Sequence, residues 1–482
     1  MSKEILIIGA GPAGLTASVE ALRNGLHVKV LESSSVVGGI SQTVLIDGWR
    51  FDLGGHRFFT KVSRVEEFWK SILPESDFLK RPRQSRIFYK GKFFDYPLKP
   101  INALAGLGII ETFRCISSYI FAQIIRNQDQ SNFEGWVSKR FGWRLYSIFF
   151  KTYTEKVWGI PANVLSSAWA AQRIKNLSLL GAVLNAFGFN TPKKEIITTL
   201  IDTFDYPRLG PGMMWESAAE VTKGLGGQLY FEEYPIEVYR ADSRICVKTN
   251  FQEIMVDHVI SSMPLSELAC LLKCDNQAVI SASQQLKYRD FLTVGLVVEG
   301  ENHFTDNWIY IHSPEVKVGR IQNFRSWSPD LVKPGYTFLG LEYFVNRDDE
   351  YWAASDEKLI ELAKDEIVKL GLVEASDLKN GYVVRVPKAY PVYDEDYLIS
   401  IETIANWLDD NWPEIIPVGR NGMHRYNNQD HSMLTAMLAI DNIRGISKQN
   451  LWTVNVDEKY HEEVSNEDNL GGRAAPVFPK KS

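Results

Sequence analysis

The sequence predicts an α/β protein that combines a parallel sheet, a helical insertion and a mainly antiparallel sheet. Three observations lead to this prediction. The chain opens with an apolar strand, a glycine-rich turn and a helix, residues 98 to about 200 have mostly helical periodicity, and residues 286–390 contain short alternating strands. At 482 residues the chain is too long for one ordinary core, so two or three domains are expected.

The N-terminal segment has the features of a Rossmann-type dinucleotide-binding site. An apolar strand at residues 5–8 leads into a G-x-G-x-x-G turn, whose glycines are Gly9, Gly11 and Gly14. The first glycine permits the tight turn, the second lets the backbone approach a pyrophosphate, and the third lets the next helix pack on the strand, with its N-terminus facing the anion. A second strand, 28–31, ends at Glu32, where a carboxylate that binds the adenosine ribose is expected.

The following loop indicates which dinucleotide is bound. Gly38 and Gly39 come shortly after Glu32, and this order is the pattern of FAD enzymes of the amine oxidase and glutathione reductase type. The two glycines let the loop pass close to the extended chain of FAD. We therefore expect FAD as the cofactor. Strand-like runs between 236 and 260 resemble the return to the cofactor domain in such enzymes, with the backbone near Val238 facing adenine.

Composition and charge narrow the class of protein. The chain is 45% hydrophobic, has a net charge of −6 and contains no basic tract, so nucleic acid is not expected as a partner. Its four cysteines are few, which favours reduced thiols and the cytoplasm. Cys270 and Cys274 have no histidine near them, so no metal site is expected. The first residues already form a strand, so no secretory leader is expected.

The most apolar segment, Ile101 to Ile125, has two interpretations. Polar residues such as Glu111 and Arg114 interrupt any run that could span a bilayer. We favour a helix packed within a soluble domain. The alternative is an interfacial helix in peripheral contact with a membrane.

The expected domains are built from five segments of the chain. The Rossmann-type FAD-binding domain takes segments 1–97, 206–285 and 399–482, the helical domain takes 98–205, and the antiparallel substrate sheet takes 286–398. Residues 87–89 and 92–94 are expected to form a hairpin, and residues 213–222 and 432–443 two further helices.

Four separated runs resemble the UDP-galactopyranose mutase family. The runs are Gly54-Gly55-His56-Arg57-Phe58-Phe59-Thr60, Tyr153-Thr154-Glu155-Lys156-Val157-Trp158-Gly159, Gly319-Arg320-Ile321-Gln322-Asn323, and Gly419-Arg420 with Arg425-Tyr426-Asn427-Asn428-Gln429-Asp430. They are similar to the family's G-P-H-x-F-x-T, Y-T-E-K-Q-W-G, T-R-I-I-E, and G-R followed by R-Y-L-D-M-D. They occur in the family's order and extend over the whole chain.

The resemblance implies a chemistry in which reduced FAD is a nucleophile. In the family, flavin N5 attacks the anomeric carbon of the sugar and displaces UDP, and the ring opens and recloses before UDP returns. The protein must then bind the diphosphate with cations and stack the uracil on aromatic rings. By this resemblance Arg320 is expected to bind the diphosphate, Tyr426 to donate a hydrogen bond to it, and Trp158 to shape the sugar pocket.

The same resemblance assigns residues to the flavin. His56, which follows Gly55, is expected beside the reactive face of the flavin. Arg420, which follows Gly419, is expected near flavin and phosphate, and Asp430 near the ribityl or pyrimidine end.

Three departures from the family pattern concern the substrate. Asn323 and Asn428 stand where the family has Glu and Asp, so two negative charges are absent from the expected substrate site. The family's mobile loop carries a second arginine four residues after the first. Here Arg173 is followed at that distance by Leu177, so Lys175 or Arg208 is a candidate substitute. We therefore expect a sugar preference different from UDP-galactopyranose.

Two enzymatic functions follow from these patterns, and a non-catalytic flavin-binding scaffold is a third alternative. The favoured one is a mutase-like isomerase that uses reduced FAD on a nucleotide-activated or phosphorylated sugar, with NAD(P)H or another reductant as electron donor and a role in polysaccharide biosynthesis. The alternative is an FAD-dependent oxidoreductase of the amine oxidase or protoporphyrinogen oxidase type, which shares the cofactor domain.

Overall fold

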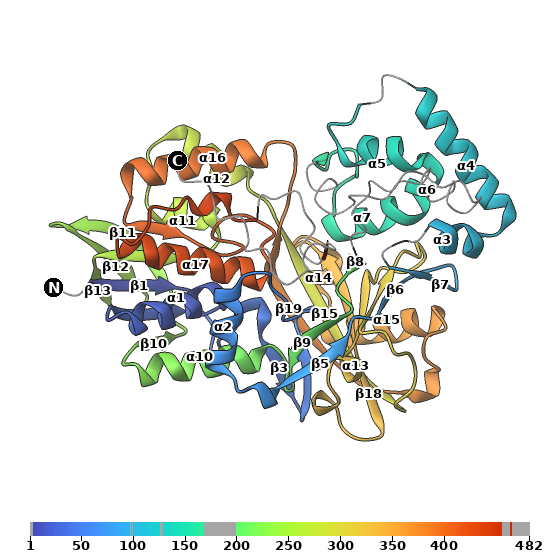
Figure 1. Cartoon of the computed structure of the whole chain (residues 1–482), viewed down its shortest axis with the longest axis horizontal. Coiled ribbons are helices and arrows are strands. Elements are labelled where there is room, and N and C mark those ends of the chain that lie inside the picture. The colour runs from blue at the N-terminus through green and yellow to red at the C-terminus, as the bar shows by residue number, and fades with distance from the viewer. Residues whose placement is uncertain are drawn as a thin grey trace.

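The computed structural model describes residues 3–96, 98, 100–125, 129–167, 199–455 and 463–464. In Figure 1 a parallel sheet with its helices occupies the left of the molecule, and a large antiparallel sheet and a group of helices occupy the right. The expected fold class is therefore confirmed, with a Rossmann-type part, a helical part and a mainly antiparallel sheet.

A five-stranded parallel sheet has the order β10-β2-β1-β14-β20. Its strands are β1 (Glu4–Ile8), β2 (His27–Glu32), β10 (Gln228–Phe231), β14 (His258–Ser261) and β20 (Ile415–Pro417). Side chains of β1 alternate between two apolar clusters, with Ile5 and Ile7 in one and Leu6 and Ile8 in the other. Because the strand is buried on both faces, it needs the continuous apolar run of the sequence.

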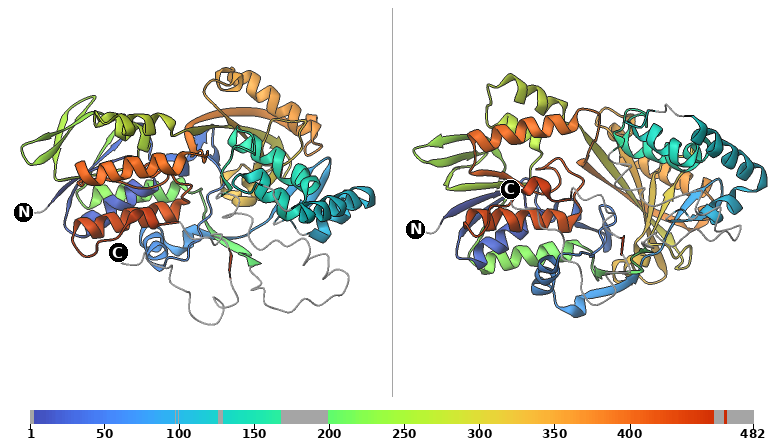
Figure 2. Two further views of the ribbon diagram at one scale, coloured as in Figure 1. Left: turned by 90° about the horizontal axis from the view of Figure 1, so that it is seen from above. Right: turned by 45° about the horizontal axis from the view of Figure 1, so that its top comes forward.

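Helices cover one face of this sheet, and a small sheet covers the other (Figures 1 and 2). The helices are α1 (Pro12–Arg23), α2 (Ser63–Ile72), α10 (Gly212–Gly224) and α17 (Gln429–Ile443). The opposite cover consists of β11 (Pro235–Ala241), β12 (Arg244–Thr249), β13 (Glu253–Val256), α11 (Leu265–Leu271), α12 (Gln277–Gln285) and α16 (Tyr397–Asn411). The expected helix at 213–222 is α10, and the expected helix at 432–443 starts earlier because Asn428 caps α17.

A seven-stranded sheet forms the second part, in the order β19-β15-β18-β17-β16-β6-β7. Its strands are β6 (Ser85–Tyr89), β7 (Lys92–Asp95), β15 (Tyr288–Glu299), β16 (Trp308–Ile311), β17 (Arg320–Asn323), β18 (Tyr336–Val345) and β19 (Leu378–Pro391). The expected hairpin is confirmed as β6–β7, and it joins this sheet through a parallel pairing of β6 with β16. Helices at the sheet are α13 (Phe324–Trp327), α14 (Glu350–Ala353) and α15 (Asp356–Lys369).

The third part is helical and lies at the upper right of Figure 1. Its helices are α3 (Pro100–Leu107), α4 (Ile109–Ile124), α5 (Phe133–Phe141), α6 (Trp143–Tyr146) and α7 (Thr152–Trp158), with a π-helical turn at Ser147–Lys151. Short pairs complete the strands: β3 (Thr43–Ile46) with β4 (Trp49–Asp52), β5 (Phe78–Pro82) with β9 (Thr203–Pro207), and β8 (Thr199–Leu200) with β21 (Glu463–Val464). Over the described residues, no helix combines the length and apolarity needed to cross a membrane.

Candidate functional site

A cavity of about 610 Å³ lies at the carboxyl ends of the parallel strands. The first glycine turn, the end of β2, the Gly39 loop, the residues after β14 and the start of α17 form its walls. Open α/β sheets bind their ligands at this edge. The predicted residues that line it are Gly9, Gly11, Glu32, Gly39, His56, Gly419 and Arg420.

The three glycines of the fingerprint have different geometric roles. Gly9 has φ +97°, and a Cβ there would lie 2.3 Å from the Ser262 Oγ. A Cβ on Gly14 would lie 1.8 Å from the Gly9 carbonyl oxygen, so this glycine permits the contact between α1 and the turn. A Cβ on Gly11 would meet only the facing Gly39 backbone, at 3.8 Å or more. Gly11 therefore keeps space open between the two loops, where a pyrophosphate would pass.

Hydrogen bonds fix the second loop against the first. The Gly38 N–H donates to the Ala10 carbonyl at 2.9 Å, and Gly38 has φ +102°. The Glu32 carboxylate accepts from the Ala10 N–H at 2.7 Å and from the Ser34 N–H at 2.9 Å. Glu32 thus orders both loops while its side chain lines the cavity.

Val238 does not line the cavity. Its side chain is buried in the core, and in β11 it pairs with Val247 of β12. The wall at this side is instead formed by Glu233, Tyr234 and Pro235, which precede or begin the strand. Sequence reasoning placed the contact within the strand, whereas the turn that enters it reaches the cavity.

The first and the fourth mutase-like runs meet at the far end of the cavity. The Gln429 side-chain amide donates to the Arg57 carbonyl at 3.0 Å, and the Thr60 hydroxyl donates to Asp430 at 3.1 Å. Asp430 lies in the first turn of α17 and is buried. Gly419 has φ +82°, and a Cβ there would lie 3.0 Å from the Ala13 Cβ. These contacts bring residues 370 positions apart to one edge of the cleft.

His56 sits in this wall as a neutral imidazole. Burial is the main cause that lowers its pKa to about 3, and the charges of the Arg420 and Arg320 guanidinium groups contribute to the same shift. The Arg420 guanidinium donates to the Asn427 carbonyl at 2.9 Å and lies 4.9 Å from the centre of the Tyr426 ring. Arg420 also lines the cavity.

Arg320 forms an ion pair with Glu342, in which the carboxylate is fully buried and the arginine side chain is 16% exposed. Its Nε donates to the Glu342 carboxylate, and Glu342 also accepts from the Gln322 amide at 3.0 Å. Burial lowers the pKa of Arg320, but the Glu342 charge raises it and prevails, so the guanidinium stays protonated. The Arg320 Nη2 lies 3.5 Å from the Tyr390 hydroxyl.

Aromatic rings surround this pair. Tyr390 stacks on Tyr426, with centroids 5.6 Å apart and planes at 16°. Trp158 is buried and lies 6.2 Å from Tyr426. Tyr153 stacks on His312 at 4.8 Å, and burial raises its pKa. A cation beside flat rings can bind an anion that carries an aromatic base.

Sequence reasoning missed part of this wall. Glu342 and Tyr390 come from β18 and β19 and carried no motif. Tyr153 belongs to the second mutase-like run, but the resemblance implies no role for it. The aromatic and charged content of the two strands was the only signal.

Three predicted site residues, Asn323, Asn428 and Gly55, make contacts that stabilise the local structure. Asn323 accepts from the Ser326 N–H at 3.4 Å and donates to the Phe304 carbonyl at 2.6 Å, so it caps α13. Asn428 caps α17 together with His431. A Cβ on Gly55 would lie 3.1 Å from the Trp327 ring, so Gly55 permits a close contact in the core.

The structure describes only one of the basic residues considered for the family's mobile-loop arginines. Arg173, Leu177 and Lys175 lie outside the described residues. Arg208 pairs with Asp77 at 2.9 Å and lies near Asp330 at 3.7 Å, and it does not line the cavity.

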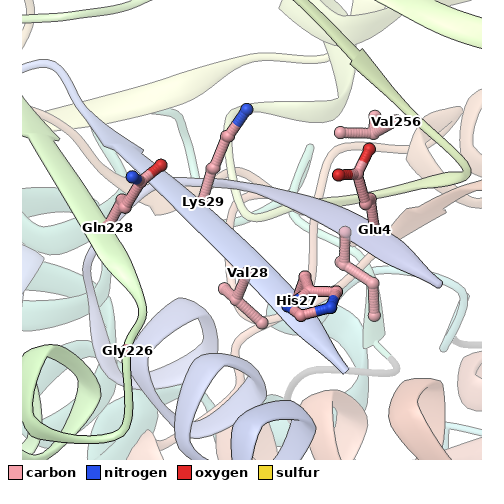
Figure 3. A pocket seen from close by; sticks show the side chains of 8 residues that line it. Glu4, His27, Val28, Lys29, Gly226, Gln228 and Val256 are labelled. Atoms are coloured by element: carbon pink, nitrogen blue, oxygen red, sulfur yellow. The ribbon is translucent and has the colours of Figure 1, made fainter. Parts of the chain in front are cut away.

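A second hollow of about 260 Å³ lies at the other end of the parallel sheet (Figure 3). Its walls include Glu4, His27 and Lys29, at the amino ends of β1 and β2, and Gln228 at the start of β10. Because ligands bind such sheets at the carboxyl ends, this hollow is not a candidate site. In the described part of the chain, no three His, Cys, Asp or Glu side chains gather to hold a metal ion.

Comparison with known proteins supports this description. The model of an NAD(P)-binding Rossmann-like domain matches residues 7–72. An L-amino-acid oxidase of Sistrurus catenatus edwardsii is 33% identical over 111 residues, 20% of this chain and 22% of that protein. A probable UDP-galactopyranose mutase of Klebsiella pneumoniae is 26% identical over 180 residues, 34% of this chain and 44% of that protein. The first curated relatives are thus matched over only about a fifth of their length.

Solved structures match over almost the whole chain. A putative protoporphyrinogen oxidase from Exiguobacterium sp. 255-15 has a TM-score of 0.71 and 18% identity, over 93% of this chain and all of that one. The chain thus has the fold of the flavoenzyme superfamily of amine oxidases and protoporphyrinogen oxidases. A reduced UDP-galactopyranose mutase has a TM-score of 0.83 and 23% identity, over 95% of this chain and all of that one. The resemblance to the mutases is therefore confirmed at the level of the fold.

Proposed function

We propose that this chain is an FAD-dependent enzyme that isomerises a nucleotide-activated sugar, in the manner of a UDP-galactopyranose mutase. The observation that carries the proposal is the partly buried Arg320, whose charge acts on Tyr153, Tyr390 and His56. Tyr390 in turn stacks on Tyr426. A diphosphate needs a fixed cation and a nucleobase needs flat rings, and this wall offers both.

The cavity fits FAD in size and in chemistry. Its volume of about 610 Å³ lies in the range of cofactor pockets. Gly11 and Gly39 leave room for a pyrophosphate at the start of α1, and Glu32 would receive the ribose hydroxyls. His56, Arg420 and the start of α17 would meet the isoalloxazine end.

When bound and reduced, FAD supplies a nucleophilic nitrogen for the anomeric carbon of the sugar. The residues of the chain then bind and orient. Arg320 would hold the diphosphate as it leaves and returns, since its charge is fixed by Glu342. Tyr426 would donate a hydrogen bond to the same group. Neutral His56 would not repel the positive charge that develops at the sugar carbon.

The test compares oxidised and reduced enzyme. Purified protein should release FAD on denaturation, and pyranose nucleotide sugars should be isomerised only after reduction by dithionite or NADPH. Borohydride should then trap a covalent flavin–sugar product. Oxygen consumption with an amine or a porphyrinogen, without any sugar product, would contradict the proposal.

Net oxidation is the second candidate function. It is supported by the matched L-amino-acid oxidase, whose matched region covers 20% of this chain. A substrate of that class would bleach oxidised flavin without a reductant, which separates the two candidates in one absorbance experiment.

A further inference from the structure

Helix α4 exposes an unusually apolar face. Cys115 and Ala122 are buried on its inner side. Six large apolar side chains on the same helix are between 53% and 77% exposed: Ile109, Ile110, Phe113, Ile120, Phe121 and Ile124. No other helix in the described ranges exposes more than two such residues. We call these six residues the α4 face. Contiguous apolar surface of this kind marks an interaction site.

The α4 face lies at an outer edge of the molecule. In Figures 1 and 2 the helix runs along the end of the helical part farthest from the parallel sheet. Its inner side packs on α5 and α6. Gly142 has φ +80°, and a Cβ there would lie 2.6 Å from the Tyr119 nitrogen, so α6 approaches α4 closely. Lys139 donates to the Ala122 and Ile125 carbonyls at 2.7 Å each, which fixes the end of the helix.

The α4 face suits the surface of a lipid bilayer. A helix of 16 residues is about 24 Å long, and the six apolar side chains form one stripe along it. Each apolar side chain that enters the acyl region of a bilayer contributes separately, so a single helix face is enough for interfacial binding.

The charges beside the α4 face suit an anionic surface. The acid of the first turn, Glu111, is paired with Arg114 at 2.6 Å and with Arg144 at 2.8 Å. The two arginine side chains are 62% and 44% exposed. Lys139 adds a further positive charge at the other end of the helix. Trp143, 51% exposed on α6, adds a side chain of the type found at membrane interfaces.

We propose that the α4 face docks this protein on the surface of a bilayer that contains anionic lipids. The helix lies in the plane of the interface, with its six apolar side chains among the acyl chains and Arg114, Arg144 and Trp143 at the headgroups. This inference is independent of the proposed function, because it concerns a different part of the molecule.

The test is flotation of the full-length protein with vesicles. One set contains phosphatidylcholine alone and the other about one third phosphatidylglycerol. The face variant is Phe113→Glu with Phe121→Glu, at side chains 68% and 65% exposed. The matched control is Phe251→Glu with Ile399→Glu, at side chains 72% and 65% exposed elsewhere on the surface. Circular dichroism and melting temperature check that both variants fold.

We expect the wild type and the control to float with the anionic vesicles, and the face variant to float at least about tenfold less. Flotation of the wild type should fall as salt concentration rises. Wild type that stays at the bottom, or a face variant that floats equally well, would overturn the proposal. Equal flotation on neutral vesicles would overturn the assignment to anionic lipid. A wild-type dimer that the face variant converts to monomers, without flotation, would assign the face to a second copy instead.

Discussion

The two sides of the proposed site are built from different parts of the chain. The cofactor side is made of backbone: the turns of Gly9–Gly14 and Gly38–Gly39, which are linked by the hydrogen bond from the Gly38 N–H to the Ala10 carbonyl. The substrate side is made of side chains: Arg320 from β17, Glu342 from β18 and Tyr390 from β19. The cofactor side depends on the absence of side chains at its glycines. The substrate side depends on the charges and the aromatic ring of its side chains.

This difference decides how each side responds to substitution. A backbone cradle fails when any Cβ fills the space that the ligand needs, whatever the chemistry of the new residue. A side-chain wall responds to charge and hydrogen bonding, and it couples binding to stability wherever the charges are buried. The following experiments test this contrast, beginning with the largest expected effect.

Gly11→Val should abolish FAD binding while the protein still folds. A Cβ there would meet backbone no closer than 3.8 Å, and the branched side chain would fill the gap to Gly38 and Gly39. Gly14→Ala should instead lower the melting temperature, because its Cβ would lie 1.8 Å from a carbonyl oxygen. Gly224→Ala, with nothing within 4 Å, is the control for both. Flavin absorbance after purification and thermal denaturation measure the two effects. If the Gly11→Val variant retains FAD, the pyrophosphate does not pass between the two glycine turns.

Arg320→Ala should weaken UDP binding by about 1.5–3 kcal/mol, the contribution of a charge-assisted hydrogen bond. It should also lower the free energy of unfolding by about 3–5 kcal/mol, because Glu342 would remain buried without its partner. Calorimetric titration and urea denaturation measure these values.

Arg86→Ala supplies the matched control for Arg320→Ala. Arg86 pairs at 2.6 Å with Asp306, which is fully buried, in the same sheet. This variant should lose stability and keep its UDP affinity. Equal loss of affinity in both variants would mean that Arg320 acts through stability alone.

His56→Asn and His312→Asn should change the pH dependence of stability in the same way. Both folded pKa values are lowered from 6.5 to about 3, and burial is the main cause. The unfolded chain therefore binds more protons between these values, and each histidine lowers stability as pH falls through that window. Each variant should remove about 1.4 kcal/mol per pH unit of this slope.

The two histidine variants differ in what else they change. His56 lines the cofactor cavity, whereas His312 stacks on Tyr153 in the substrate wall. Only His56→Asn should shift the flavin absorption bands, and only His312→Asn should weaken UDP binding without that shift. A spectral shift in both would show that the two sides are not separate.

The difference between the two sides also explains which parts of the site could be predicted from the sequence. The cofactor side was readable because its glycines and Glu32 lie within 31 consecutive residues and their spacing is set by backbone geometry. The hairpin β6–β7 was predicted from its turn, but its place beside β16 depends on a pairing across more than 200 residues. Glu342 and Tyr390 were missed for the same reason, since only the sheet register brings them to Arg320.

The two asparagines show a further limit of motif comparison. Position by position, Asn323 and Asn428 replace acids of the mutase pattern, and this difference predicted a changed substrate preference. Their side chains cap α13 and α17 in the structure. A motif aligns positions and does not reveal which way a side chain points.

Asn428→Asp should have the smallest effect of these substitutions. Asp and Asn are similar as N-caps, and the added charge at the start of α17 is mildly favourable, so stability should change by less than about 0.5 kcal/mol. If Asn428 only caps the helix, turnover of UDP-galactopyranose should change by less than about threefold, which is under about 0.7 kcal/mol. Asn276→Asp is the control, because Asn276 caps α12 by accepting from the Ala278 N–H at 2.9 Å. A gain of tenfold or more in Asn428→Asp alone would mean that residue 428 reaches the sugar, and the substrate side would then extend to the start of α17.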